Sequence, residues 1–178
     1  MRTAGPSDHA EIEDLVRASF RQYSGLMVPA QVFEHYLDDL LDLDRHARHG
    51  YLLVVEVDGR IRASGAFYPD ASVQGLGLPR GWAGGGAMAV HPDVRGRGVA
   101  TTLLTEAERL ARTVEAPVFA FHTVSFMSAA VALYERMGYR RAPEYDFDFG
   151  ARYGLSTPPR TTAITYRRDL PRAHEERL

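Results

Sequence analysis

Hydrophobic residues recur at helical spacing in the first fifty residues of the chain. One stripe consists of Ile12, Leu15, Val16 and Phe20 and predicts a first helix. Asp8 and Glu11, at its start, have the spacing of a capping box. A wider apolar stripe after Pro29 predicts a second helix. The basic run over 45–50, which ends at Gly50, is interpreted as the C-terminal end of that second helix.

From residue 51 the hydrophobic period changes to two, which is typical of strands. Strands are predicted over 51–57 and 60–68, joined by the two-residue turn Asp58-Gly59. A strand over 82–91 contains Gly84, Gly85 and Gly86, which suggest a bulge or a close approach by another backbone or a ligand. The remaining predicted elements are a helix over 98–113, a strand over 117–123, a helix over 128–137, and strands over 145–149 and 161–168. This order predicts a mixed α/β sheet with helices on both faces.

The turn Arg95-Gly96-Arg97-Gly98 lies between the strand over 82–91 and the helix over 98–113. Glycines there leave backbone N–H groups uncovered at a helix N-terminus, which is the local chemistry of a phosphate site. A P-loop requires a lysine at its end, and this sequence contains none. A dinucleotide fingerprint requires a third glycine or alanine where this chain has Thr101. Both of these alternatives are therefore disfavoured.

The spacing Arg95-x-x-Gly98-x-Ala100 resembles the pyrophosphate-binding motif of the GNAT superfamily, the acyl-CoA-dependent N-acyltransferases. The strand exit over 88–92 and the segment 130–139, with Tyr134, are similar to two further signatures of that family. The resemblance covers about residues 84–139 and implies a GNAT-like α/β (α+β) single domain over residues 1–170, with a C-terminal tail over 171–178. Its sheet is expected to be mixed, mostly antiparallel and splayed at the CoA-binding strand. The chain departs from the family at Met127, where an Asn is common.

The resemblance implies that acetyl-CoA is the co-substrate and assigns residues to it. The backbone of Met88, Ala89 and Val90 would pair with the pantetheine arm. The pyrophosphate would be wrapped by the amides of Arg95, Gly96, Arg97, Gly98, Val99, Ala100 and Thr101. Helix geometry independently supports an anion there, because the first-turn amides of a helix have no intrahelical acceptor.

Tyr134 is the residue that the resemblance assigns to protonation of the departing thiolate. A phenol, with a pKa near ~10, keeps its proton at neutral pH and can protonate a thiolate of similar basicity. The general base is less defined: His122 is the leading candidate, with His91 and Glu56 as alternatives. The implied reaction is acetyl transfer to a primary amine of a small molecule or a peptide, by direct attack. A non-catalytic acyl-CoA-binding or sensing module on the same fold is the alternative.

Composition excludes several other classes of function. The formal net charge of -2 gives no electrostatic case for binding nucleic acid or an anionic membrane. Cysteine is absent, and the seven histidines have no metal-ligand spacing, so we expect no metal. No stretch approaches the ~18 apolar residues of a membrane span, and we expect a cytoplasmic protein. A homodimer remains open. Acceptor specificity is expected in the first two helices, the loop over 69–81 and the region over 146–159.

Overall fold

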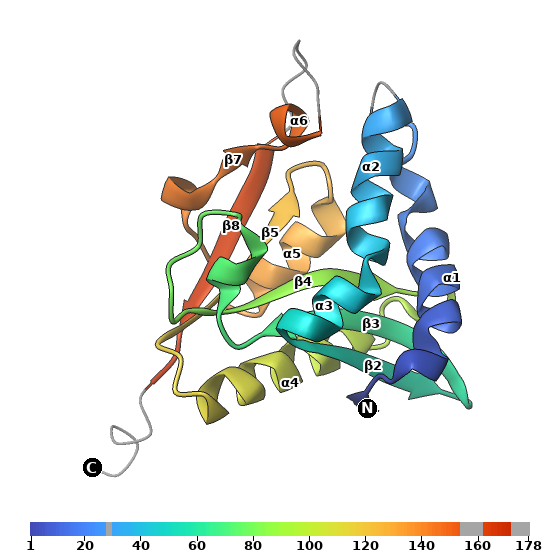
Figure 1. The fold of residues 1–178 in the computed structure, drawn as a ribbon, viewed down its shortest axis with the longest axis horizontal. Helices are drawn as coiled ribbons and strands as arrows, with labels where there is room; N and C mark the ends of the chain where they lie inside the picture. Colours follow the sequence, from blue (N-terminus) through green and yellow to red (C-terminus); the bar gives the residue numbers. More distant parts are fainter. Residues whose placement is uncertain (28–29, 154–161, 172–178) are drawn as a thin grey trace. The chain divides into compact units, whose positions relative to one another are not determined.

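The computed structural model describes residues 1–27, 30–153 and 162–171. The chain divides into two compact units, each formed by two stretches of sequence. Unit 1 comprises Met1–Phe67 and Ala87–Leu104, and unit 2 comprises Tyr68–Gly86 and Thr105–Leu178. Because the boundaries fall inside two strands, β3 (Arg60–Tyr68) and β4 (Ala83–Val90), and one helix, α4 (Val99–Thr113), each of these three elements contributes residues to both units (Figure 1).

The helices and strands that the hydrophobic pattern predicts occur in the predicted order, and the structure adds further short ones. The helices are α1 (His9–Phe20), α2 (Ala30–Leu41), α3 (Leu43–His49), α4 (Val99–Thr113), α5 (Ser128–Arg136) and α6 (Phe149–Arg152). The strands are β1 (Arg2–Thr3), β2 (Tyr51–Val57), β3 (Arg60–Tyr68), β4 (Ala83–Val90), β5 (Val118–Val124), β6 (Arg140–Arg141), β7 (Phe147–Asp148) and β8 (Thr162–Asp169). Short 3-10 helices are η1 (Pro6–Asp8), η2 (Arg21–Tyr23), η3 (Ala71–Gln74), η4 (Pro92–Val94) and η5 (Pro143–Tyr145).

The strands form one eight-stranded sheet in the order β1-β2-β3-β4-β5-β8-β6, with β7 paired to β8. The β4–β5 pair is parallel, whereas the β1–β2, β2–β3, β5–β8, β6–β8 and β7–β8 pairs are antiparallel. The prediction of a mixed, mostly antiparallel sheet is therefore confirmed.

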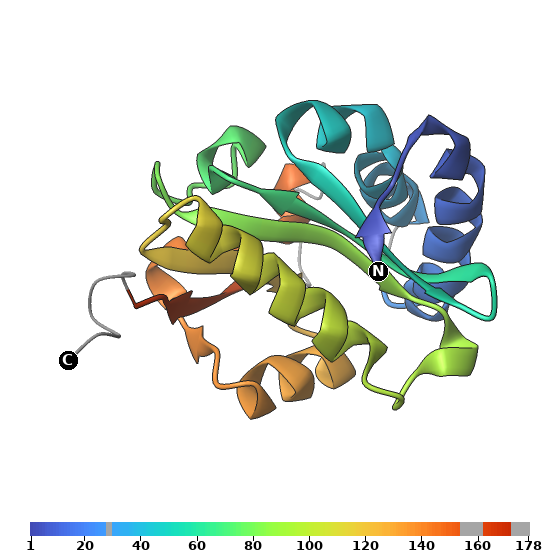
Figure 2. The ribbon, with the colours of Figure 1, turned by 90° about the horizontal axis from the view of Figure 1, so that it is seen from below.

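Unit 1 is organised around the β2–β3 hairpin. Its turn has φ values of 52° at Asp58 and 73° at Gly59, the left-handed pair that matches the twist of the flanking strands. The predicted stripe of α1 is buried, with Ile12 and Val16 each 1% exposed. In Figure 2, α1, α2 and α3 lie on one side of the hairpin and the first turn of α4 lies on the other. This arrangement provides the apolar contacts that the helical stripes require.

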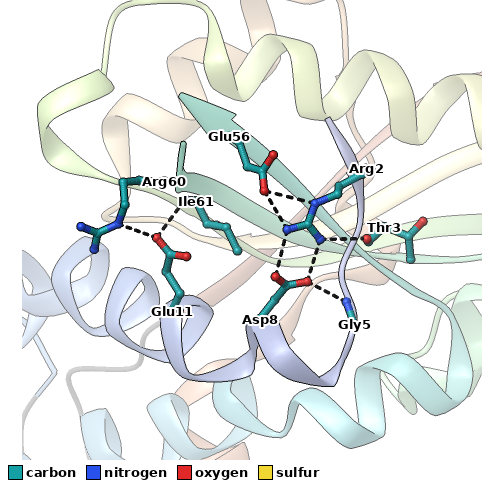
Figure 3. A network of polar contacts seen from close by, with 8 residues as sticks. All are labelled: Arg2, Thr3, Gly5, Asp8, Glu11, Glu56, Arg60 and Ile61. Atoms are coloured by element: carbon teal, nitrogen blue, oxygen red, sulfur yellow. Dashed lines mark hydrogen bonds and ion pairs between the residues drawn. The ribbon is translucent and has the colours of Figure 1, made fainter. Parts of the chain in front are cut away.

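Ion pairs hold β1 and α1 against the hairpin (Figure 3). The Arg2 guanidinium donates to Asp8 at 2.7 Å and to Glu56 at 2.7 Å, and holds the pKa of Asp8 down to about 2. The capping box predicted from Asp8 and Glu11 is wrong. Asp8 accepts the amide of Gly5 at 2.8 Å, while Glu11 accepts from the side chain of Arg60 at 2.8 Å. The cap therefore lies one turn earlier, because Glu11 has a partner on β3.

The second predicted helix is two helices, α2 and α3. Asp42 leaves the helical region with a ψ of 63°, and its carboxylate accepts the amide of Arg45 at 3.1 Å. An aspartate that caps a new helix in this way ends the preceding one. The basic run is thus the end of α3, and Gly50 stops it as expected. The predicted start at Pro29 lies outside the described residues.

Unit 2 is organised around β5, which is covered on both faces. It pairs with β8 from Val118↔Asp169 to Val124↔Ala163. Phe121 packs against Tyr134 of α5, with ring centroids 4.5 Å apart. The alternate residues, Val118 and Ala120, cluster with Ala71 and Leu78, against which Trp82 and Tyr145 pack. Because side chains alternate along a strand, odd-numbered residues of β5 face α5 and even-numbered residues face η3 and η5.

The strand predicted over 145–149 is only partly correct. β7 has two residues, and the chain then forms α6, which begins where Asp148 accepts the amide of Ala151 at 3.0 Å. The two-residue strands β1 and β6 were not predicted, because a segment that short has no periodicity to read. The predicted end of the chain's last strand agrees within one residue, whereas its predicted start, Thr161, lies outside the described residues.

Candidate functional site

The glycine-rich turn forms a loop of unit 1 in front of α4. Gly96 and Gly98 have φ values of 76° and 78°, and a Cβ at either would meet nothing within 4 Å. Glycine is required there for its left-handed backbone, while the space in front of the loop is open. The amide of Arg95 donates to Pro92 at 3.2 Å and that of Arg97 to Val94 at 3.3 Å.

Two of the seven amides that are expected to wrap the pyrophosphate, those of Arg95 and Arg97, donate within the loop. Helical bonding resumes at Thr102, whose amide donates to the carbonyl of Gly98 at 2.9 Å. The first amides of α4, at Val99, Ala100 and Thr101, have no intrahelical acceptor. These amides lie at the positive end of the helix dipole and suit an anion.

The side chain of Arg95 fixes this loop to the C-terminal end of α1. It donates to the carbonyl of Ser19 at 3.1 Å and to Oε1 of Gln22 at 3.2 Å. The hydroxyl of Ser19 in turn donates to the carbonyl of Val90, at the end of β4, at 3.0 Å. Arg95 therefore has a structural role in the loop, although it is exposed, as Arg97 is. The sequence offered no sign of this link, since Ser19 and Val90 are 71 residues apart.

Strand β4 is irregular where it carries its predicted ligand-pairing residues. Ala87 has a φ of 48°, which is uncommon for a residue with a side chain. Of the three residues that follow, Ala89 is buried, while Met88 and Val90 are half-buried.

In unit 2, the glycines of β4 allow the close approach that was predicted. A Cβ at Gly84 would lie 2.6 Å from the Cβ of Ala71 and 3.0 Å from the carbonyl oxygen of Ala120. The parallel β4–β5 ladder consists of Ala83↔Phe119 and Gly84↔Ala120, although β5 continues to Val124. The two strands therefore pair only at their beginnings.

Tyr134, the predicted acid, is a buried residue of α5 that is 5% exposed. Its ring packs on those of Phe121, Tyr139 and Tyr166, with centroids at 4.5, 6.2 and 5.7 Å. The aromatic contacts fix the orientation of the ring within unit 2.

A buried carboxylate supports this aromatic cluster. Glu108 of α4 is 4% exposed and accepts from the hydroxyl of Tyr139 at 2.5 Å and from Arg168 at 2.8 Å. Burial and the bond to Glu108 raise the pKa of Tyr139. Arg168 also donates to the carbonyl of Met137, at the end of α5. Sequence reasoning missed this network; its one signal was a glutamate on the inward face of α4, in line with Leu104 and Ala111.

His122, the leading candidate base, lies on the other face of β5. Its Nε2 is 3.1 Å from the carbonyl oxygen of Tyr145, so this nitrogen is the donor and carries the hydrogen. The ring packs against Phe147 at 5.0 Å, and burial lowers the pKa of His122. The imidazole is therefore neutral at pH 7, with the lone pair on Nδ1. Because Phe121 faces Tyr134, the side chains of His122 and Tyr134 lie on opposite faces of β5.

The two other candidate bases have structural partners within unit 1. Glu56 accepts two bonds from Arg2, at 2.7 and 3.1 Å. Nδ1 of His91 accepts the amide of Asp93 at 3.3 Å and thereby caps η4. These contacts leave His122 as the best-placed candidate.

Several other residues singled out in the sequence have structural roles. Met127, which replaces the family's usual Asn, is buried and accepts from the hydroxyl of Thr123 through its sulfur at 3.7 Å. Asp146 accepts from Arg141 at 2.6 Å and from the amide of Thr165 at 2.7 Å. Since Asp148 caps α6, both aspartates of the segment over 145–149 are engaged in internal bonds.

Two features are absent from the described residues. No group of three or more His, Asp or Glu side chains there could hold a metal ion. No helix among them has the length and apolar composition needed to cross a membrane.

A family model described as the acetyltransferase (GNAT) family matches residues 8–139. No curated protein matches the chain. Among solved structures, the PaiA N-acetyltransferase from Thermoplasma acidophilum in complex with coenzyme A aligns with a TM-score of 0.71 at 12% identity, over 95% of this chain and 97% of that one. A GNAT family acetyltransferase from Brucella melitensis in complex with acetyl-CoA aligns with a TM-score of 0.56 at 23% identity, over 96% and 90% of the two chains.

A Bacillus anthracis protein assigned as a streptothricin acetyltransferase, in complex with acetyl coenzyme A, aligns with a TM-score of 0.57 at 18% identity. That alignment covers 68% of this chain and 63% of that one. At such identities these matches establish the fold. The family model covers most of the sequence, and the chain belongs to the GNAT acetyltransferase family.

Proposed function

We propose that this protein transfers the acetyl group of acetyl-CoA to a primary amine of a small molecule or a peptide. The observation that carries the proposal is the loop in front of α4. Two left-handed glycines expose the first amides of a long helix, and the space before both glycines is open. This chemistry suits the pyrophosphate of coenzyme A. The family match and the neighbours solved with coenzyme A or acetyl-CoA support the same ligand.

In the proposed reaction, the amine nitrogen attacks the thioester carbonyl, a C–N bond forms and the C–S bond breaks. The amine loses a proton to Nδ1 of His122, and the thiolate takes a proton from the phenol of Tyr134. A neutral imidazole is needed for the first transfer, and the lowered pKa of His122 supplies one. We assign the backbone of Met88, Ala89 and Val90 to the pantetheine arm and the amides of Gly98 through Thr101 to the pyrophosphate.

Release of free thiol from acetyl-CoA tests this function directly. We expect acetyl-CoA to raise the melting temperature and thiol release to depend on an added amine, in a panel of alkylamines, amino acids, aminoglycosides and peptides. Stabilisation by acetyl-CoA without thiol release from any member of the panel would indicate the non-catalytic binding module instead. A chain that neither binds acetyl-CoA nor releases thiol would contradict both.

Tyr134→Phe tests the proposed acid. The substitution keeps the ring that packs on Phe121 and removes the proton donor. We expect kcat to fall by about 10²-fold or more, as is usual for loss of a general acid, with little change in acetyl-CoA affinity. Turnover equal to that of the wild type across the pH range would exclude the role. Calorimetric titration with acetyl-CoA and the melting temperature serve as controls for folding.

A further inference from the structure

The side chain of Gln74 lies flat against the glycines of β4 in unit 2. Its Nε2 is 3.3 Å from the position of a Cβ on Gly84, and its Oε1 is 3.2 Å from that of a Cβ on Gly86. The ring of Tyr68 approaches the same position on Gly86 to 3.3 Å. Side chains at these two positions would displace the Gln74 amide, so the glycines make room for it.

The amide nitrogen of Gln74 is buried, yet it has no hydrogen-bond partner among the described residues. The hydroxyl of Thr165, a residue with 0% exposure, is also buried and also has no hydrogen-bond partner among the described residues. Buried polar groups in folded proteins are normally paired, and the exceptions call for a reason such as a bound ligand. Two unpaired groups in one region of unit 2 therefore point to a missing partner.

Strand register places both groups on the face that carries His122. Gly84 pairs with Ala120, and Gly86 and His122 each follow that pair by two residues. Since side chains alternate along strands, the Gln74 amide and the His122 imidazole are on the same face. Oε1 of the amide lies over Gly86, where β4 and β5 have stopped pairing, and Nε2 lies over Gly84, in the last pair of the ladder. Thr165 lies directly opposite His122 in the β5–β8 ladder, so its hydroxyl shares that face.

The chemistry of these groups defines what they can bind. Nδ1 of His122 is an acceptor and suits the N–H of an attacking amine, whereas Nε2 of Gln74 is a donor and requires an oxygen. An alkylamine satisfies the first group and leaves the second unpaired. An amine with a carbonyl or carboxylate oxygen on the neighbouring carbon satisfies both.

We infer that Gln74 selects acceptors with a carbonyl or carboxylate oxygen beside the reacting amine, which is the chemistry of an amino acid, its amide or a peptide N-terminus. The inference rests on the proposed acetyl transfer and names the class of its acceptor. Gln74 is uncharged, so it accommodates a neutral carbonyl as well as a carboxylate. The charge preference is read out separately by comparing alanine with alaninamide.

The test compares alaninamide with sec-butylamine, which has the same branched amine and no carbonyl. In Gln74→Met and Gln74→Glu, which keep the length of the side chain and lack the donor, we expect kcat/KM for alaninamide to fall about tenfold or more. For sec-butylamine we expect a change of less than about threefold. For each acceptor, the ratio of variant to wild-type kcat/KM cancels the different basicity of the two amines. Thr165→Val should change both acceptors by the same factor, because the inference assigns the carbonyl oxygen to Gln74 and not to Thr165.

An equal change for the two acceptors in both Gln74 variants, or no change, would overturn the inference and leave acetyl transfer intact. A selective loss in Thr165→Val alone would assign the carbonyl to Thr165 and would also overturn it. Absence of thiol release by the wild-type protein with every amine contradicts the proposed function itself, and the inference with it. Melting temperature and acetyl-CoA affinity, measured on all variants, separate these outcomes from misfolding.

Discussion

At the scale of single residues, environment decides which titratable group can act as a base. His122 and His91 both lie at or near the ends of predicted strands, and the sequence favours His122 without showing what either side chain contacts. The structure gives His91 a capping role through Nδ1, whereas it binds His122 through Nε2 and leaves Nδ1 as the acceptor. Glu56, the carboxylate alternative, is held by Arg2. The hydrogen bonds of each candidate therefore indicate whether it can act as a base better than its residue type does.

The pH profile of kcat/KM tests His122. Burial lowers its pKa, so the imidazole stays neutral above its ordinary pKa of about 6.5 and for some distance below it. As the pH falls, protonation of the free acceptor amine lowers kcat/KM first. We expect a further decline only below about pH 6.5, on an additional acid limb that reflects protonation of His122.

His122→Asn should abolish that acid limb and lower kcat/KM by about 10²-fold, since asparagine cannot accept the proton. His91→Asn serves as the matched control, because His91 caps a loop and should keep the limb. An unchanged acid limb in His122→Asn would assign the base to another group or to water.

At the scale of elements, the ends of helices and strands are positioned by side chains from distant segments. The loop before α4 is anchored through Arg95 to Ser19 and Gln22, and Ser19 also holds the end of β4. The end of α5 is held by Arg168, and Gly138 permits this because its φ is 82° and a Cβ there would lie 2.9 Å from Nη2 of Arg168. The two glycine-dependent turns thus depend on arginines as well.

The anchoring of the loop predicts an effect on ligand affinity from outside the loop. In Gln22→Ala, Arg95 loses one of its two acceptors, so the loop is less ordered before it binds. Because a hydrogen bond contributes about 0.5–1.5 kcal/mol, we expect the Kd for acetyl-CoA to rise by about two- to tenfold. Arg21→Ala, a neighbouring exposed residue of η2, should leave the Kd unchanged. Equal affinities of Gln22→Ala and wild type would show that the anchor has no part in binding.

At the scale of the whole molecule, each unit is formed by two segments that are distant from each other in the sequence. In unit 1, Arg2 joins β1, η1 and β2 through Asp8 and Glu56 (Figure 3). In unit 2, Glu108 joins α4 to β8 and to Tyr139, three residues after the end of α5. The first network is exposed and depends on pH, whereas the second is buried.

Acid titration tests the exposed network. The pKa of Asp8 is lowered to about 2 in the folded protein, against about 3.9 in an unfolded chain. The folded state therefore binds the proton more weakly, and the contribution of Asp8 to stability is complete above about pH 4 and disappears as the pH falls toward 2. We expect Asp8→Asn to melt at a lower temperature than wild type at pH 7, with a gap that narrows below pH 4. Asp14→Asn, an exposed residue of α1, should show no such gap.

The sequence by itself determined the elements whose signals are local. The stripe of α1, the Asp58-Gly59 hairpin and the turn at Gly96 and Gly98 were predicted correctly, because periodicity and a left-handed φ depend on neighbouring residues alone. The family motif placed the loop and Tyr134 in order along the chain.

Only the tertiary structure decided how those elements are used. Asp42 ends α2 by capping the next helix, and the side chain of Arg95 donates to Ser19 and Gln22. His122 and Tyr134 lie on opposite faces of β5. The side chain of Gln74 lies over Gly84 and Gly86, two glycines whose role the sequence did not specify. Such contacts join residues as far apart as 76 positions, and their partners are set by packing and strand register, which no local pattern encodes.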